Sequence, residues 1–141
     1  MNEQELRQAM SALEVYRVQL QSIAENMQLI QISQEELIRA RETLSQYRNA
    51  EIGSDILVPI GGNSFVFAKA SDNSKAIVGI GTGISVEKSM DDAMKTMDER
   101  SNELAESMQK LDERRDALEA QAEQLSRTVQ MEMQALQAQG Q

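Results

Sequence analysis

The sequence predicts a mainly helical α+β protein, in which a long antiparallel two-helix coiled coil carries two β-hairpins at one end. Apolar residues recur every seven positions in both flanks, and the segment between the flanks holds six of the seven glycines. Each flank would form a helix about 70 Å long, whereas a compact domain of this length has a radius of gyration of roughly 14 Å. We therefore expect the chain to fold back on itself as one domain, with a helix over 1–52, hairpins over 53–88 and a helix over 89–141.

The first flank carries a coiled-coil seam. One series of positions, each seven apart, starts at Leu6, and a second series starts at Ala9. Ten of these twelve positions are apolar, as in a coiled coil whose a and d positions face a partner helix. Gln34 and Arg41 are the two exceptions.

The last flank repeats this pattern. Its two series start at Met90 and Met94, and eleven of fourteen positions are apolar. Ser101, Arg115 and Glu132 interrupt the seam. The two flanks therefore supply two apolar faces that can pack against each other.

Residues at the helix boundaries agree with these limits. Asn2 precedes Glu5 by three positions, and Ser89 precedes Asp92 by three. Both pairs have the form of an N-cap and its reciprocal acidic residue. Gly53 is the expected end of the first helix.

The middle segment reads as four short strands. Its apolar runs are β-branched or aromatic, and glycine, asparagine, serine and aspartate separate them. Two small hairpins bury too little area to be stable alone and would leave apolar edges in water. We therefore expect oligomerisation through the sheet. The predicted strands are Ile56–Ile60, Ser64–Ala70, Ala76–Ile80 and Ile84–Val86.

The composition excludes several classes of function. The chain has no cysteine and no histidine, which removes Ser-His-Asp triads, cysteine nucleophiles, disulfides and His- or thiolate-bound metals. A net charge of −9 without a basic cluster disfavours nucleic acid as a direct partner. No run approaches the roughly 18 apolar residues of a membrane span. We therefore expect a cytoplasmic protein that is not an enzyme, with no cofactor, no metal and no membrane contact.

Two motifs that suggest chemistry have structural interpretations. Alternate glycines at Gly79, Gly81 and Gly83 resemble a phosphate-binding loop, but their spacing and context do not match G-x-G-x-x-G. They suit a strand with one bare face against which another backbone packs. The adjacent acids at 91–92 and 112–113 are typical of a helix start and a solvated face.

Apolar residues outside the seam indicate a binding surface. Met10, Met131 and Met133 lie off the seam near the two chain ends, where a coiled coil frays most readily. They form either an adaptable binding surface or a poorly ordered end with incidental methionines. A further apolar set lies on the outer side of the first helix, where a neighbouring subunit or a client would cover it. This set comprises Val15, Val18, Leu29 and Ile32.

The order of elements and two local motifs resemble one known family. Ile56-Leu57-Val58-Pro59-Ile60 enters the first hairpin, and Val78-Gly79-Ile80-Gly81-Thr82-Gly83, followed by Val86-Glu87-Lys88, leaves the second. Over its whole length the chain resembles the α-class subunits of the prefoldin family. The β-class subunits of that family carry a single hairpin, so the two hairpins favour the α class.

The resemblance implies an ATP-independent chaperone. Two α-class and four β-class subunits would join their hairpins in a double β-barrel, and coiled-coil tips would hold unfolded proteins and deliver them to a group II chaperonin. The residues implied in assembly are Ile56, Val58, Phe65, Phe67, Ile77, Ile80 and Ile84. Those implied in client contact are Leu6, Met10, Leu13, Met131, Met133 and Leu136. The alternative function is a structural coiled-coil tether or adaptor without client-holding activity.

Overall fold

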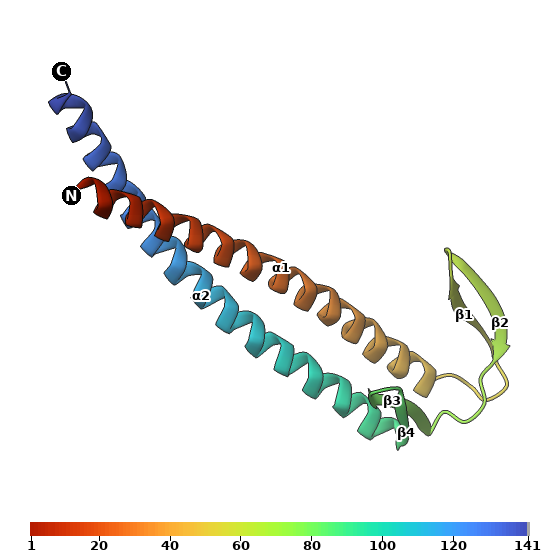
Figure 1. Ribbon diagram of the computed structural model, residues 1–141. Helices are drawn as coiled ribbons and strands as arrows, with labels where there is room; N and C mark the ends of the chain where they lie inside the picture. The colour runs from red at the N-terminus through yellow and green to blue at the C-terminus, as the bar shows by residue number, and fades with distance from the viewer. Residues whose placement is uncertain (141) are drawn as a thin grey trace. The chain divides into compact units, whose positions relative to one another are not determined.

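The computed structural model describes residues 1–140 and confirms the predicted order of two long helices around two β-hairpins (Figure 1). Helix α1 spans Glu3–Arg48 and helix α2 spans Met90–Gln139. Between them lie strands β1 (Asp55–Gly61), β2 (Ser64–Lys69), β3 (Lys75–Gly81) and β4 (Ile84–Ser89). The chain forms two compact units. Unit 1 contains residues 1–32 and the chain from 105 onward, and unit 2 contains residues 33–104.

The helix starts follow the predicted capping chemistry. The backbone N–H of Glu5 donates to Asn2 Oδ1 at 2.8 Å, and the Asn2 N–H donates to Glu5 Oε2 at 3.4 Å, which completes a capping box. At α2 the N–H of Asp92 donates to Ser89 Oγ at 3.1 Å. Helix α1 ends at Arg48, before the expected Gly53.

The linkers explain this early end of α1. The side-chain amide of Asn73 donates to the backbone carbonyls of Arg48 at 3.0 Å and Ala50 at 3.1 Å. It thereby satisfies acceptors that a helix end otherwise leaves unpaired. Gly53 instead adopts a φ of +87° in the turn that leads into β1, and its N–H donates to the carbonyl of Ala70 at 2.7 Å.

The predicted seam is the packed face of both helices. In unit 1, Ala9, Ile23 and Val129 are buried, and the other seam residues are half-buried with the exception of Leu136. The N-terminal ammonium of Met1 lies 3.1 Å from Glu132 Oε2, so the start of α1 lies beside the end of α2. The two helix segments of unit 1 therefore run antiparallel.

Unit 2 shows the same antiparallel pairing at the other ends of the helices. Arg41 Nε donates to Asp98 Oδ1 at 2.6 Å, and Arg48 Nη2 lies 2.5 Å from Asp91 Oδ1. Arg41, one of the two seam exceptions on α1, therefore connects the helices by an ion pair at the edge of the seam instead of by apolar packing.

Each hairpin is a two-stranded antiparallel sheet closed by a tight turn. Gly61 pairs with Ser64, and Gly81 pairs with Ile84. The two residues of each turn have positive φ, including Asn63 at 56° and Thr82 at 53°, as in type I′ turns. The first three strands lie within one residue of their predicted bounds. Strand β4 extends past Val86 to Ser89, because Glu87, Lys88 and Ser89 pair with β3.

The two hairpins differ in how they contact the helices. The hairpin β3–β4 lies against the start of α2 (Figure 1). The hairpin β1–β2 approaches only the end of α1, where Ile56 and Leu57 line a pocket with Thr43 and Tyr47. Val78 is 2% exposed, and Met90 and Ala93 at the start of α2 are also buried. Arg100 Nη2 donates to the carbonyl of Gly79 at 2.6 Å, and Lys88 Nζ donates to Thr96 Oγ1 at 3.1 Å. Hairpin β3–β4 is therefore fixed to α2 by apolar and polar contacts.

Candidate functional site

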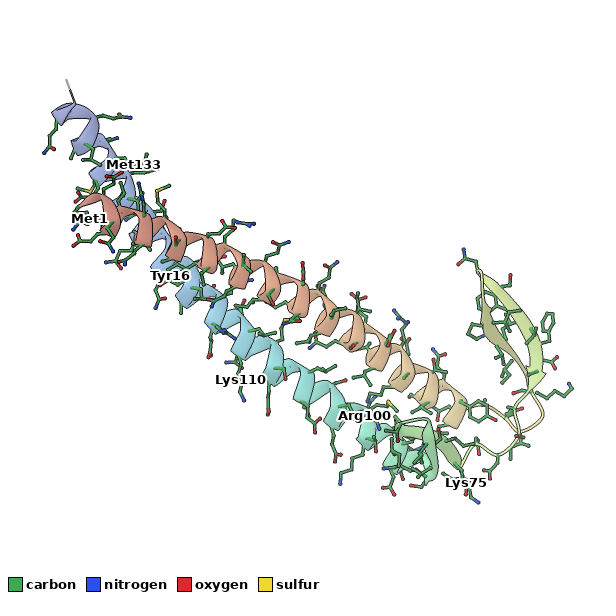
Figure 2. The ribbon with its side chains drawn as sticks, in the orientation of Figure 1. Met1, Tyr16, Lys75, Arg100, Lys110 and Met133 are labelled. Atoms are coloured by element: carbon green, nitrogen blue, oxygen red, sulfur yellow. The ribbon has the colours of Figure 1, made fainter. Side chains whose placement is uncertain are left out.

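The six residues predicted to contact clients lie at one end of unit 1, and we call them the terminal cluster: Leu6, Met10, Leu13, Met131, Met133 and Leu136. The ion pair between Met1 and Glu132 holds the start of α1 beside the end of α2. Figure 2 shows Met1 and Met133 at this same end. Residues far apart in sequence thus bring apolar side chains to the same end of unit 1.

Exposure divides the terminal cluster into two groups. Leu6 and Leu13 are half-buried in the seam. Met10, Met131, Met133 and Leu136 are between 43% and 69% exposed. Unbranched methionine side chains adapt to partners of different shape. The exposed members therefore have the properties of a surface for varied apolar ligands, and their contact with clients stays a prediction.

Two arginines near the terminal cluster pair with carboxylates on their own helices. Arg7 Nη2 lies 3.0 Å from Glu3 Oε1, and Arg127 Nη2 lies 2.5 Å from Glu123 Oε1. Exposed pairs of this kind contribute little to stability. They leave the methionines as the chemically distinctive side chains of this end.

The structure describes no arrangement that suggests catalysis or metal binding. Within residues 1–140, no group of three or more acidic, cysteine or histidine side chains is placed to hold a metal. In the same part of the chain, every buried side-chain nitrogen or oxygen has a hydrogen-bond partner. Neither described helix is both long and apolar enough to cross a membrane.

The first hairpin is a second candidate surface, because both of its faces are apolar. Residues that pair across the strands share a face. Val58 pairs with Val66 on one face, and Leu57 pairs with Phe67 on the other. All four side chains are exposed. A stable sheet of this composition normally has both faces covered.

Only one face of the second hairpin is apolar. Val78 pairs with Val86 on the face that packs toward α2, whereas Ile77 pairs with Glu87 on the opposite face. That opposite face also carries Gly79, which has no side chain. Of the residues predicted in assembly, Ile56 is half-buried, and the rest are exposed: Val58, Phe65, Phe67, Ile77, Ile80 and Ile84.

Sequence reasoning missed three exposed apolar residues of the first hairpin, namely Leu57, Ile60 and Val66. The available signal was the unbroken apolar run of β1. Such a run predicts burial on both faces, whereas alternation predicts burial on one.

Comparisons with known proteins decide the family. The family described as "Prefoldin subunit" matches residues 16–135 of this chain. The chain belongs to the prefoldin family. Curated relatives named prefoldin subunit alpha include that of Methanopyrus kandleri, which is 38% identical over 73% of this chain and 68% of its own length. That of Methanococcus aeolicus is 30% identical over 99% of this chain and 94% of its own.

Solved prefoldin structures have the same fold. The filamentous PFD of Methanocaldococcus jannaschii aligns with a TM-score of 0.73 at 23% identity, covering 84% of this chain and 98% of its own. The prefoldin beta subunit of Thermococcus strain KS-1 aligns with a TM-score of 0.56 at 17% identity, covering 90% of each chain. The curated relatives confirm the resemblance to α-class prefoldin subunits, and the solved structures confirm the mainly helical α+β fold.

Proposed function

We propose that this prefoldin chain holds unfolded polypeptides through the terminal cluster and delivers them to a group II chaperonin in the cytoplasm, without using ATP. The observation that carries the proposal is the group of exposed, flexible apolar side chains at the ends of both helices. Such side chains gain free energy when an apolar segment covers them. They require no nucleotide for this step.

The proposal includes assembly with β-class prefoldin subunits, as two α-class and four β-class chains. The two apolar faces of hairpin β1–β2 support it, because a lone two-stranded sheet is marginally stable in water. Partner strands would cover both the unpaired edges and the exposed side chains. Residues 53–88 would then act as the oligomerisation platform, and the two helices would carry the client surface.

The test of client holding uses the chain assembled with its β-class partner. We would replace Met10, Met131 and Met133 by Gln and measure light scattering as a chemically unfolded protein is diluted into buffer. The expected result is unchanged assembly and a clear loss of aggregation suppression. The loss follows because glutamine keeps the length of methionine but interacts favourably with water.

A control variant tests whether the effect depends on where the exposed apolar residues lie in the chain. Ile52 is an exposed apolar residue of unit 2, outside both helices, and Ile52→Gln should leave suppression unchanged. Equal suppression by the methionine variant and the wild type would contradict the role of the terminal cluster. Saturable binding to one folded partner, with no effect on unfolded chains, would instead support a structural tether.

A further inference from the structure

A second apolar surface of unit 1 follows α1 beyond the terminal cluster. It consists of Val15, Val18, Leu29 and Ile32, which we call the side stripe. Its members are between 48% and 62% exposed. Positions 15, 18, 29 and 32 recur at intervals of three and eleven, so they share one face of a 3.6-residue helix. From Val15 to Ile32 the stripe extends about 26 Å at 1.5 Å per residue.

One member of the side stripe, Leu29, borders a groove between the two helix segments of unit 1. The groove has a volume of about 450 Å³ and is lined by Asn26, Leu29, Ile30, Ser107, Lys110 and Leu111. Leu29, Ile30 and Leu111 supply its apolar walls. A groove of this volume has room for one or two apolar side chains of an extended segment.

The charges of unit 1 indicate the chemistry of the occupant. Residues 1–32 and 105–141 carry 11 acidic and 6 basic side chains, a net charge of −5. Four of the six basic residues are paired with acidic neighbours on their own helices, namely Arg7, Arg17, Arg115 and Arg127. A second copy of unit 1 would place like charges together, so the side stripe disfavours self-association.

Glu25 is an acidic residue within the side stripe. It lies between the two apolar pairs of the stripe, seven residues after Val18 and four before Leu29. Glu25 makes no ion pair with any residue in the described part of the chain. By contrast, Arg17 donates to Glu14 at 2.5 Å and holds the pKa of that carboxyl below its usual value.

One basic side chain lies near the groove, and it has acidic neighbours. Lys110 lines the groove from α2 and is labelled in Figure 2. Glu106 and Glu113 share a surface with it. These two carboxylates lie near the positive charge of Lys110, and acidic side chains outnumber basic ones in unit 1, 11 to 6.

We propose that the side stripe binds extended segments of unfolded polypeptide in which a lysine or arginine lies between two apolar groups. This inference rests on the proposed client-holding function and adds a second site with a stated preference. The apolar groups cover Val15 and Val18 at one end and Leu29 and Ile32 at the other. The basic residue pairs with Glu25 between them. At about 3.3 Å per extended residue, the segment is about eight residues long.

The test measures fluorescence anisotropy of labelled, unstructured peptides with the full chain assembled with its partner subunits. One peptide places lysines between apolar groups, and a matched peptide has glutamate at the same positions. We expect the lysine peptide to bind about tenfold more tightly at about 0.05 M salt, with a smaller difference at about 0.5 M. Equal affinities at low salt would overturn the preference.

Variants assign the binding to the side stripe. Leu29→Gln with Ile32→Gln should weaken binding of the lysine peptide by about tenfold. The control is Ile38→Gln, because Ile38 lies on α1, off the stripe, and is 62% exposed, as Leu29 is. Glu25→Gln should reduce the difference between the two peptides while retaining binding of both. If the double variant binds as the Ile38→Gln control does, the side stripe is not a client site.

The two assays together distinguish a failure of the side stripe from a failure of client holding. Aggregation suppression that depends on the terminal cluster, with peptide affinity unaffected by the stripe variants, would overturn the side stripe alone. A wild-type assembly that neither suppresses aggregation nor binds either peptide would overturn both. Loss of peptide binding in the stripe variants with normal helical content, measured by circular dichroism, supports the site.

Discussion

Val78 and Val58 occupy corresponding places in the two hairpins, and this makes the different packing of the hairpins testable. Val78 pairs with Val86 in the second hairpin, and Val58 pairs with Val66 in the first. Val78 is 2% exposed and Val58 is 38% exposed. The same change to alanine at both positions therefore compares a buried site with a partly exposed one.

The expected magnitudes follow from the carbon atoms removed. Val→Ala deletes two methyl groups, and a buried methylene contributes about 0.8 kcal/mol. With an additional term for the cavity, Val78→Ala should lower the free energy of opening of β3–β4 by about 2 to 3 kcal/mol. The methyl groups of Val58 are partly exposed, and their removal leaves no closed cavity. Val58→Ala should therefore lower the free energy of opening of β1–β2 by about 1 kcal/mol or less.

Native-state hydrogen exchange of the isolated chain measures these values for each hairpin. A change of 1.4 kcal/mol corresponds to about tenfold in the exchange rate, so the two variants should be readily distinguished. In the assembled protein the order should change, with Val58→Ala weakening subunit association more than Val78→Ala. Equal effects in the isolated chain would refute the conclusion that only the second hairpin is packed against α2.

Two substitutions and one pH titration test individual contacts. Arg100→Ala removes the hydrogen bond to the Gly79 carbonyl, and it should increase exchange of the β3–β4 amides by about tenfold; unchanged exchange would mean that apolar contacts alone fix the hairpin. Asn2→Ala removes the acceptor for the Glu5 N–H and should destabilise the first turn of α1 by about 1 kcal/mol, measured by amide exchange of residues 3–6, with Gln4→Ala as the control. Hydrogen bonds from the Ser74 side chain and backbone lower the pKa of Asp72 from its ordinary value of 3.8. The stabilisation by this carboxylate is thus fully present above pH 3.8 and is lost as the pH falls through the lower, folded value. An NMR titration should show Ser74 amide shifts following that lower pKa, and an Asp72 carboxyl that titrates at 3.8 would contradict the bond.

The seam illustrates what periodicity predicts and what it leaves open. Apolar spacing placed Ile23 and Val129 in the packed face, and both are buried. It identified Arg41 only as an interruption of the seam. Its partner Asp98 lies 57 residues away, and the spacing within one helix carries no information about the side chains that the other helix places opposite.

Strand ends show the same limit. The apolar pattern placed the end of β4 at Val86, because the next three residues are polar. Those residues remain in the strand because β3 supplies backbone partners for Glu87 and Lys88. Backbone pairing depends on the neighbouring strand. Polar residues therefore stay in a strand as long as the neighbouring strand offers backbone partners.

The sequence by itself determined the two helices, the four strands, the N-cap residues and the apolar seam. Each of these depends on side-chain periodicity or on hydrogen bonds between residues close in the chain. Only the tertiary structure decided that hairpin β3–β4 packs on α2 while β1–β2 exposes two apolar faces. It also decided that Leu29 borders a groove with Leu111. Both depend on which distant residues become neighbours, and that follows from the packing of whole elements against one another.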